Sequence, residues 1–102
     1  MISQHYINKR FQRNELISKI GIGKPIESFA VDKGHKDGSE IHIITSTGLI
    51  VIYNRNSHKL CTVLIARPNQ IKRYYVDLGR NDFPNSVLEL AYKHMKMGYN
   101  KI

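Results

Sequence analysis

SEIHIITSTGLIVIYNRNSHKLCTVLIARPNQIKRYY, residues 39–75, is the stretch that decides the fold class. Three apolar runs rich in β-branched residues are separated by short turn-forming segments, the pattern of consecutive strands joined by hairpins. The middle run, LIVIY at 49–53, has almost no polar alternation, so we expect a central strand that is covered on both faces. The stretch therefore predicts an antiparallel meander that ends in a basic and aromatic segment.

Helix-forming residues flank this sheet on both sides. Residues 3–20 contain neither proline nor glycine and precede Gly21, which predicts an N-terminal helix. Its apolar positions do not keep one stripe past Asn14, so we expect a bent helix or two helices. Residues 26–33 favour an additional first strand, and residues 86–98 favour a closing helix. The predicted fold is α+β: an N-terminal helix packed on a three- to four-stranded antiparallel sheet, closed by a C-terminal helix.

Size and composition restrict the class of protein. With 102 residues, 41% of them hydrophobic, the chain is expected to form a single domain over residues 1–102. Cys61 is the lone cysteine and lies in an apolar run, so we expect a buried structural thiol. No apolar stretch approaches the roughly 18 residues that a membrane span requires, and we expect a cytoplasmic protein without a membrane partner.

The charge balance indicates a class of partner. The chain has 16 Lys and Arg against 8 Asp and Glu, a formal charge of +8. Clustered cationic side chains are the electrostatic signature of nucleic-acid binding, although any polyanion attracts such a chain. The composition therefore favours RNA or another nucleic acid.

A first candidate site lies on the predicted N-terminal helix. His5, Lys9 and Arg13 recur every four residues, which places them along one edge of a helix. A neutral imidazole there could take a proton from a ribose 2′-OH while the cations neutralise charge that develops on the phosphate. The spacing fits metal-free RNA cleavage, and it also fits an ordinary solvated helix face.

His35 is a second candidate for acid–base chemistry, because it lies in a polar loop bounded by glycines. His42 follows on a strand, and both histidines also have purely structural interpretations. No spacing of His, Cys, Asp or Glu indicates a zinc site, and the chain has no phosphate-binding glycine loop and no nucleophile-elbow motif. We therefore expect neither a metal nor a cofactor.

A third group combines a hydroxyl, cations and tyrosines. Its members are Thr62, Arg67, Lys72, Arg73, Tyr74 and Tyr75. Alternation along a strand puts Thr62 and Arg67 on opposite faces. The cations after the strand can bind phosphates, and tyrosine rings stack on unpaired bases at about 1–3 kcal/mol per base. In the alternative interpretation, one of the two tyrosines closes the core under the last helix.

Over about residues 3–67 the chain resembles a known superfamily. The resemblance rests on the helix with His-x3-Lys-x3-Arg, the glycine-marked loop, and three strands of which the last holds TVLI at 62–65. It is the barnase, EndoU, colicin and RelE-like ribonuclease superfamily. In that superfamily a helix packs on a four-stranded antiparallel sheet, and compact toxin members cleave RNA without a metal. Two features depart from the pattern. The extension LIARPNQIKRYY at 64–75 and the closing helix at 86–98 are additional, and Lys9 stands where arginine is more usual.

The resemblance also implies roles for individual residues. His5 would be the helix-borne acid or base, Lys9 and Arg13 would contact phosphate, and Thr62 would supply a hydroxyl. The residues that would line the substrate groove are Lys72, Arg73 and Tyr75.

Three hypotheses about function follow. The first is a metal-independent endoribonuclease of toxin or mobile-element type, for which an acidic antitoxin or inhibitor protein would be a partner. The second is a non-catalytic RNA- or nucleic-acid-binding module. The third is a small phage-type adaptor or inhibitor that binds an acidic protein surface.

Overall fold

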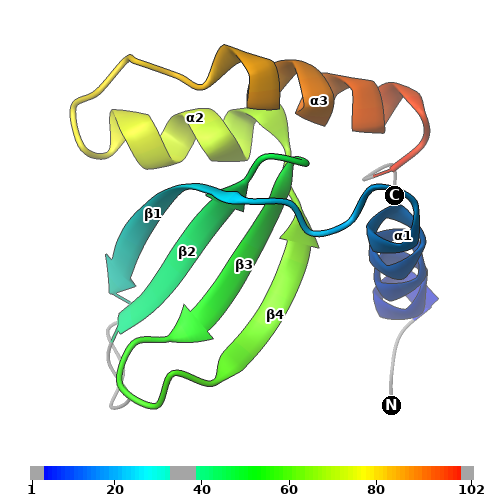
Figure 1. The fold of residues 1–102 in the computed structure, drawn as a ribbon, viewed down its shortest axis with the longest axis horizontal. Helices are drawn as coiled ribbons and strands as arrows, with labels where there is room; N and C mark the ends of the chain where they lie inside the picture. Colours follow the sequence, from blue (N-terminus) through cyan, green and yellow to red (C-terminus); the bar gives the residue numbers. More distant parts are fainter. Residues whose placement is uncertain (1–3, 33–38, 100–102) are drawn as a thin grey trace.

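The computed structural model describes the backbone of residues 4–32 and 39–99, and the side chains of residues 10–32 and 39–99. The chain has an α+β fold with an antiparallel sheet, as predicted (Figure 1). Its elements in chain order are α1 (Gln4–Ile20), β1 (Pro25–Asp32), β2 (Ser39–Thr45), β3 (Leu49–Asn54), β4 (Leu60–Ile65), α2 (Pro68–Val76) and α3 (Asn85–Lys96).

The four strands form an antiparallel meander in the order β1-β2-β3-β4. β3 has a neighbour on each side, which confirms the prediction of a central strand. Ile52 of β3 lies opposite His42 on β2 and Thr62 on β4. This register places His42 and Thr62 on the same face of the sheet, because residues that pair directly across strands share a face.

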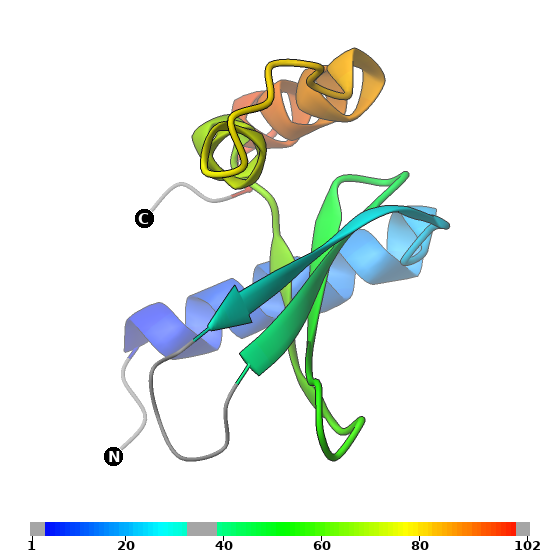
Figure 2. The same ribbon diagram turned by 90° about the vertical axis from the view of Figure 1, so that its left-hand side faces the viewer.

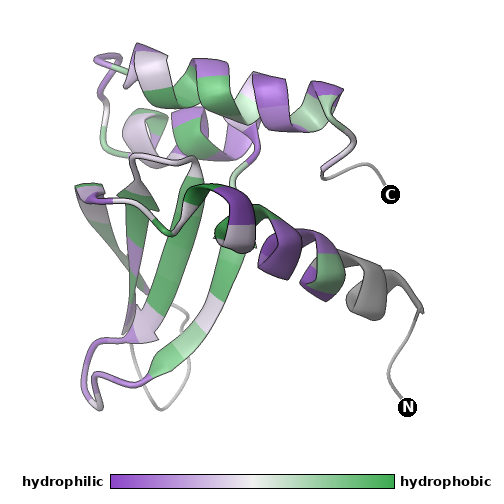
Figure 3. Ribbon diagram, turned by 45° about the vertical axis from the view of Figure 1, so that its right-hand side comes forward, coloured by the Kyte–Doolittle hydropathy of each residue, from purple (hydrophilic) through white to green (hydrophobic). Residues whose placement is uncertain are grey.

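The sheet has a hydrophobic cluster on each face. On one face Ile44, Ile50 and Ile52 pack with the apolar sides of α2 and α3. On the other face Leu49 packs with Leu16 of α1. Hydrophobic residues accordingly run along the strands in Figure 3, and Figure 2 shows α2 and α3 together on one side of the sheet, away from α1. The apolar run of β3 is thus covered from both sides, as its composition predicted.

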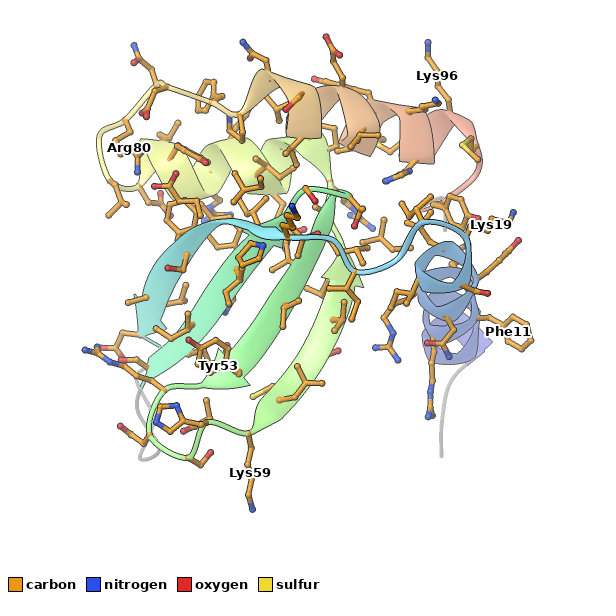
Figure 4. The ribbon with its side chains drawn as sticks, in the orientation of Figure 1. Phe11, Lys19, Tyr53, Lys59, Arg80 and Lys96 are labelled. Carbon is orange, nitrogen blue, oxygen red and sulfur yellow. The ribbon has the colours of Figure 1, made fainter. Side chains whose placement is uncertain are left out.

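Helix α1 is one continuous helix from Gln4 to Ile20, so the predicted alternative of two helices divided at Asn14 was wrong. Asparagine inside a helix costs only about 0.7 kcal/mol or less relative to alanine, which does not force a break. The interrupted apolar stripe has a different cause. Leu16 is 1% exposed against the sheet, whereas Phe11 is 75% exposed and points away from the body (Figure 4). Helix α1 therefore needs apolar side chains only around Leu16, where it packs on the sheet.

The region after β4 contains a helix that the sequence analysis did not identify. Helix α2 begins at Pro68, and the backbone N–H of Arg67, its N-cap, donates to Gln70 Oε1 at 3.5 Å. Proline is favoured at the first helical position because its fixed φ suits the helix and its missing N–H would have had no intrahelical partner. The C-terminal part of the fold is therefore a pair of helices instead of one.

Cys61 is exposed, so the prediction of a buried thiol was wrong. Within the described part of the chain β4 is an edge strand, and Leu60 beside Cys61 is also exposed. The apolar composition of the run reflects the burial of Val63 and Ile65 further along the strand. Among the helices that the structure describes, none is long and apolar enough to cross a membrane.

Candidate nucleic-acid interface

Three of the predicted residues lie outside what the structure describes. His5 and Lys9 belong to α1, but their side chains are not among those described, and His35 lies in the segment 33–38. Their predicted roles in acid–base chemistry and phosphate binding stay predictions.

Two predicted residues, 49 positions apart, lie in contact. Arg13 Nη1 on α1 donates to Thr62 Oγ1 at 3.3 Å and to the carbonyl oxygen of Val63 at 3.2 Å. These contacts place a guanidinium beside the Thr62 hydroxyl and attach α1 to β4. They also give the Val63 carbonyl oxygen a hydrogen-bond donor, which on an edge strand would otherwise come from water. The predicted strand alternation of Thr62 and Arg67 does not apply, because β4 ends at Ile65 and Arg67 is the exposed N-cap of α2.

Tyr75 is a core residue at 1% exposure, which corrects its predicted role as a stacking surface for RNA bases. Its ring makes edge contacts with Phe29 and Phe83, at centroid distances of 5.1 and 5.9 Å, and its hydroxyl donates to Glu27 Oε2 at 3.2 Å. Burial, together with the Glu27 carboxylate, raises the pKa of Tyr75 to about 12. The alternative interpretation, in which a tyrosine closes the core, applies to this residue.

Arg80 completes this network from within the α2–α3 connection. Its guanidinium pairs with both Glu27 and Asp82 and lies 4.9 Å from the centroid of the Tyr75 ring. The hydrogen bond from Arg80 lowers the pKa of Glu27 and also that of Asp82. The network joins β1 to the connection between α2 and α3. Because its guanidinium pairs with two carboxylates, Arg80 has a structural role.

Tyr74 is half-buried and is held on two sides. Its ring stacks on Phe29 at a centroid distance of 5.1 Å, and its hydroxyl lies 2.6 Å from His42 Nδ1. Burial raises the pKa of the Tyr74 hydroxyl, which favours the protonated phenol that donates to the imidazole. With one ring face on Phe29 and its hydroxyl engaged, Tyr74 is poorly placed to receive a base.

His42 is 6% exposed and has a partner at each ring nitrogen. Nε2 lies 3.0 Å from Glu40 Oε1, and a carboxylate can only accept, so Nε2 carries a proton; in a neutral imidazole Nδ1 then accepts from the Tyr74 hydroxyl. The chain Glu40–His42–Tyr74 is a buried polar connection between β2 and α2. The structural interpretation of His42 therefore accounts for all of its contacts.

The cationic side chains of the helix pair are accessible: Arg73, Lys93 and Lys96 are exposed, and Lys72 is half-buried. The inward positions of these helices are apolar and include Ile71, Tyr75, Val87 and Ala91. α2 and α3 together hold four lysine and arginine residues and a single acidic residue, Glu89. We define the α2–α3 outer face by Lys72, Arg73, Tyr92, Lys93 and Lys96.

An aromatic ring lies among these cations. Lys72 Nζ on α2 is 6.0 Å from the centroid of the Tyr92 ring on α3, and Tyr92 is 49% exposed. Lys96 follows Tyr92 by one helical turn and points away from the body in Figure 4. The face thus offers N–H donors that suit phosphate oxygens and a ring with accessible surface.

The sequence analysis identified Lys72 and Arg73 but missed Tyr92, Lys93 and Lys96. The spacing of Tyr92 and Lys96 on a predicted helix was a usable signal, because residues four apart are neighbours. Their proximity to Lys72 had no local signal, since it arises from two helices packing side by side on one sheet. Within the described residues, no group of three or more His, Cys, Asp or Glu side chains could hold a metal ion.

Comparisons with family models, with curated proteins and with solved structures each found no match to this chain. Fold and charge distribution thus describe a small basic α+β protein with a cationic, tyrosine-bearing helix pair.

Proposed function

We propose that the protein binds RNA through the α2–α3 outer face. The observation that carries this proposal is the concentration of four cations and a single acidic residue on two adjacent helices whose apolar sides pack inward. Lysine and arginine bind the phosphate backbone and release counterions, which supplies most of the affinity in sequence-independent binding. The formal charge of +8 adds long-range attraction for the same partner.

Charge reversal tests the assignment of the face. Arg73 and Lys96 are both exposed, so the double variant Arg73→Glu/Lys96→Glu should keep the fold. We expect its RNA affinity to fall about tenfold to a hundredfold, and the slope of log affinity against log salt between about 50 and 200 mM to become shallower by about two. Fluorescence anisotropy with a labelled RNA measures both quantities.

A matched control separates a binding site from general attraction. Arg55 and Lys59 are exposed around the β3–β4 turn, at the end of the sheet opposite the helix pair (Figure 4), and Arg55→Glu/Lys59→Glu changes the net charge equally. We expect a much smaller loss of affinity for this variant. Equal losses for the two variants would mean that RNA responds to net charge alone and would reject the α2–α3 outer face as the site.

A second candidate function is metal-independent RNA cleavage, and the contact between Arg13 and Thr62 favours it. In this proposal His5 takes the proton from a ribose 2′-OH, and the 2′-oxygen attacks the adjacent phosphorus. The P–O5′ bond breaks and the 5′-oxygen takes a proton from water, which gives a 2′,3′-cyclic phosphate and a 5′-hydroxyl end. The guanidinium of Arg13 neutralises the charge that develops on the phosphate oxygens, and Thr62 holds the guanidinium in place.

Incubation of labelled RNA in EDTA tests this second candidate. We expect the wild-type protein to release fragments with cyclic-phosphate ends, and His5→Ala to lose this activity while it retains RNA affinity. RNA that the wild-type protein binds but leaves intact would reject the nuclease and leave the binding proposal standing.

A further inference from the structure

We infer that Tyr92 is a stacking platform for an unpaired base, so that the α2–α3 outer face selects single-stranded over double-stranded RNA. This inference rests on the proposed RNA-binding function. Its basis is the exposure of one particular ring. Among the tyrosines whose side chains the structure describes, Tyr92 is 49% exposed, whereas Tyr75 and Tyr99 are buried and Tyr53 and Tyr74 are only partly exposed.

The position of Tyr92 among cations distinguishes it from an incidental surface tyrosine. Lys72 lies over the ring at 6.0 Å and joins it to α2, while Lys96 lies one turn further along α3. A base that stacks on the exposed part of the ring would bring its flanking phosphates toward ammonium groups on both sides. Aromatic rings interleaved with cations in this way bind single strands without sequence preference, because every base has a flat face.

A base in a duplex must first leave its base pair before it can stack on Tyr92, whereas an unpaired base need not. The bases of a duplex are already paired and stacked, and removing one from the helix costs a few kcal/mol. Double-stranded RNA would therefore interact with the cations of the α2–α3 outer face but not with the Tyr92 ring. Loss of the ring should lower single-strand affinity and leave duplex affinity nearly unchanged.

Phe11 provides a matched control, because it is also an exposed aromatic residue, at 75%, but lies on α1. The variants Tyr92→Leu, Tyr92→Phe and Phe11→Leu are compared by anisotropy with a short single-stranded RNA and with the corresponding duplex. A 2-aminopurine base in the single strand reports stacking through quenching of its fluorescence.

We expect Tyr92→Leu to weaken single-strand binding about five- to a hundredfold and to abolish the quenching. Tyr92→Phe should retain both properties because it keeps the ring, and Phe11→Leu should match the wild type. If Tyr92→Leu binds single strands like the wild type while Arg73→Glu/Lys96→Glu does not, the stacking inference is overturned and RNA binding by the face survives. If the wild type binds neither form of RNA, both proposals fail.

Discussion

Replacement of Tyr75 by alanine is expected to lower the free energy of unfolding by about 3–5 kcal/mol, the usual range for truncation of a large buried aromatic side chain. Tyr75 is 1% exposed and lies where α2, β1 and the α2–α3 connection meet. Its removal opens a cavity between Phe29 and Phe83 and leaves Arg80 without the ring that it covers. Urea unfolding followed by circular dichroism measures the loss.

Tyr75→Phe separates the ring from the hydroxyl. It keeps the aromatic contacts and removes only the hydrogen bond to Glu27, whose carboxylate is still paired with Arg80. We expect a loss of about 1 kcal/mol, typical of one hydrogen bond, with RNA affinity unchanged. An alanine variant as stable as the phenylalanine variant would show that Tyr75 is not part of the core, and its predicted role in RNA stacking would then be open again.

The second large effect concerns the connection between α1 and β1. Gly23 has φ of +87°, and a Cβ at this position would lie 2.7 Å from Ser46 Oγ and 2.9 Å from the backbone nitrogen of Thr47. The β2–β3 turn is held there because Thr47 Oγ1 lies 2.6 Å from the carbonyl oxygen of Ile22 and the backbone N–H of Lys24 donates to Ser46 Oγ. We expect Gly23→Ala to cost about 2–5 kcal/mol, the sum of left-handed strain and overpacking.

Gly21→Ala is the matched control, because Gly21 has a similar φ of +76° but nothing within 4 Å of an added Cβ. It should cost only about 1–2 kcal/mol, from the left-handed backbone alone. Thermal and urea unfolding of both variants give the difference, which measures the contact between the loop and the turn. Equal costs would contradict the close approach of Gly23 to the β2–β3 turn.

The sequence predicted those helices and strands that short-range interactions along the chain stabilise. The strands between residues 39 and 65 were predictable because β-branched runs separated by turn residues form hairpins largely through short-range contacts. The helix at 85–96 was predictable from its helix-forming residues and from the glycine that follows it. Helix α2 was missed because Pro68 directly follows an apolar strand run, where a proline is typical of a strand end, although proline also starts helices. Continuity of α1 through Asn14 was missed because its apolar side is needed only near Leu16.

The sequence by itself determined the α+β class, the central position of β3 and the excess of positive charge, because composition and short-range periodicity encode these properties. Only the tertiary structure decided which tyrosines are covered and which cations lie together. Tyr75 is buried and Tyr92 is exposed although both lie on amphipathic helices of similar kind. Arg13 reaches Thr62, and Lys72 reaches Tyr92, because separate elements pack on a common sheet. Such contacts depend on how apolar surfaces fit together over long sequence distances, and no local spacing encodes them.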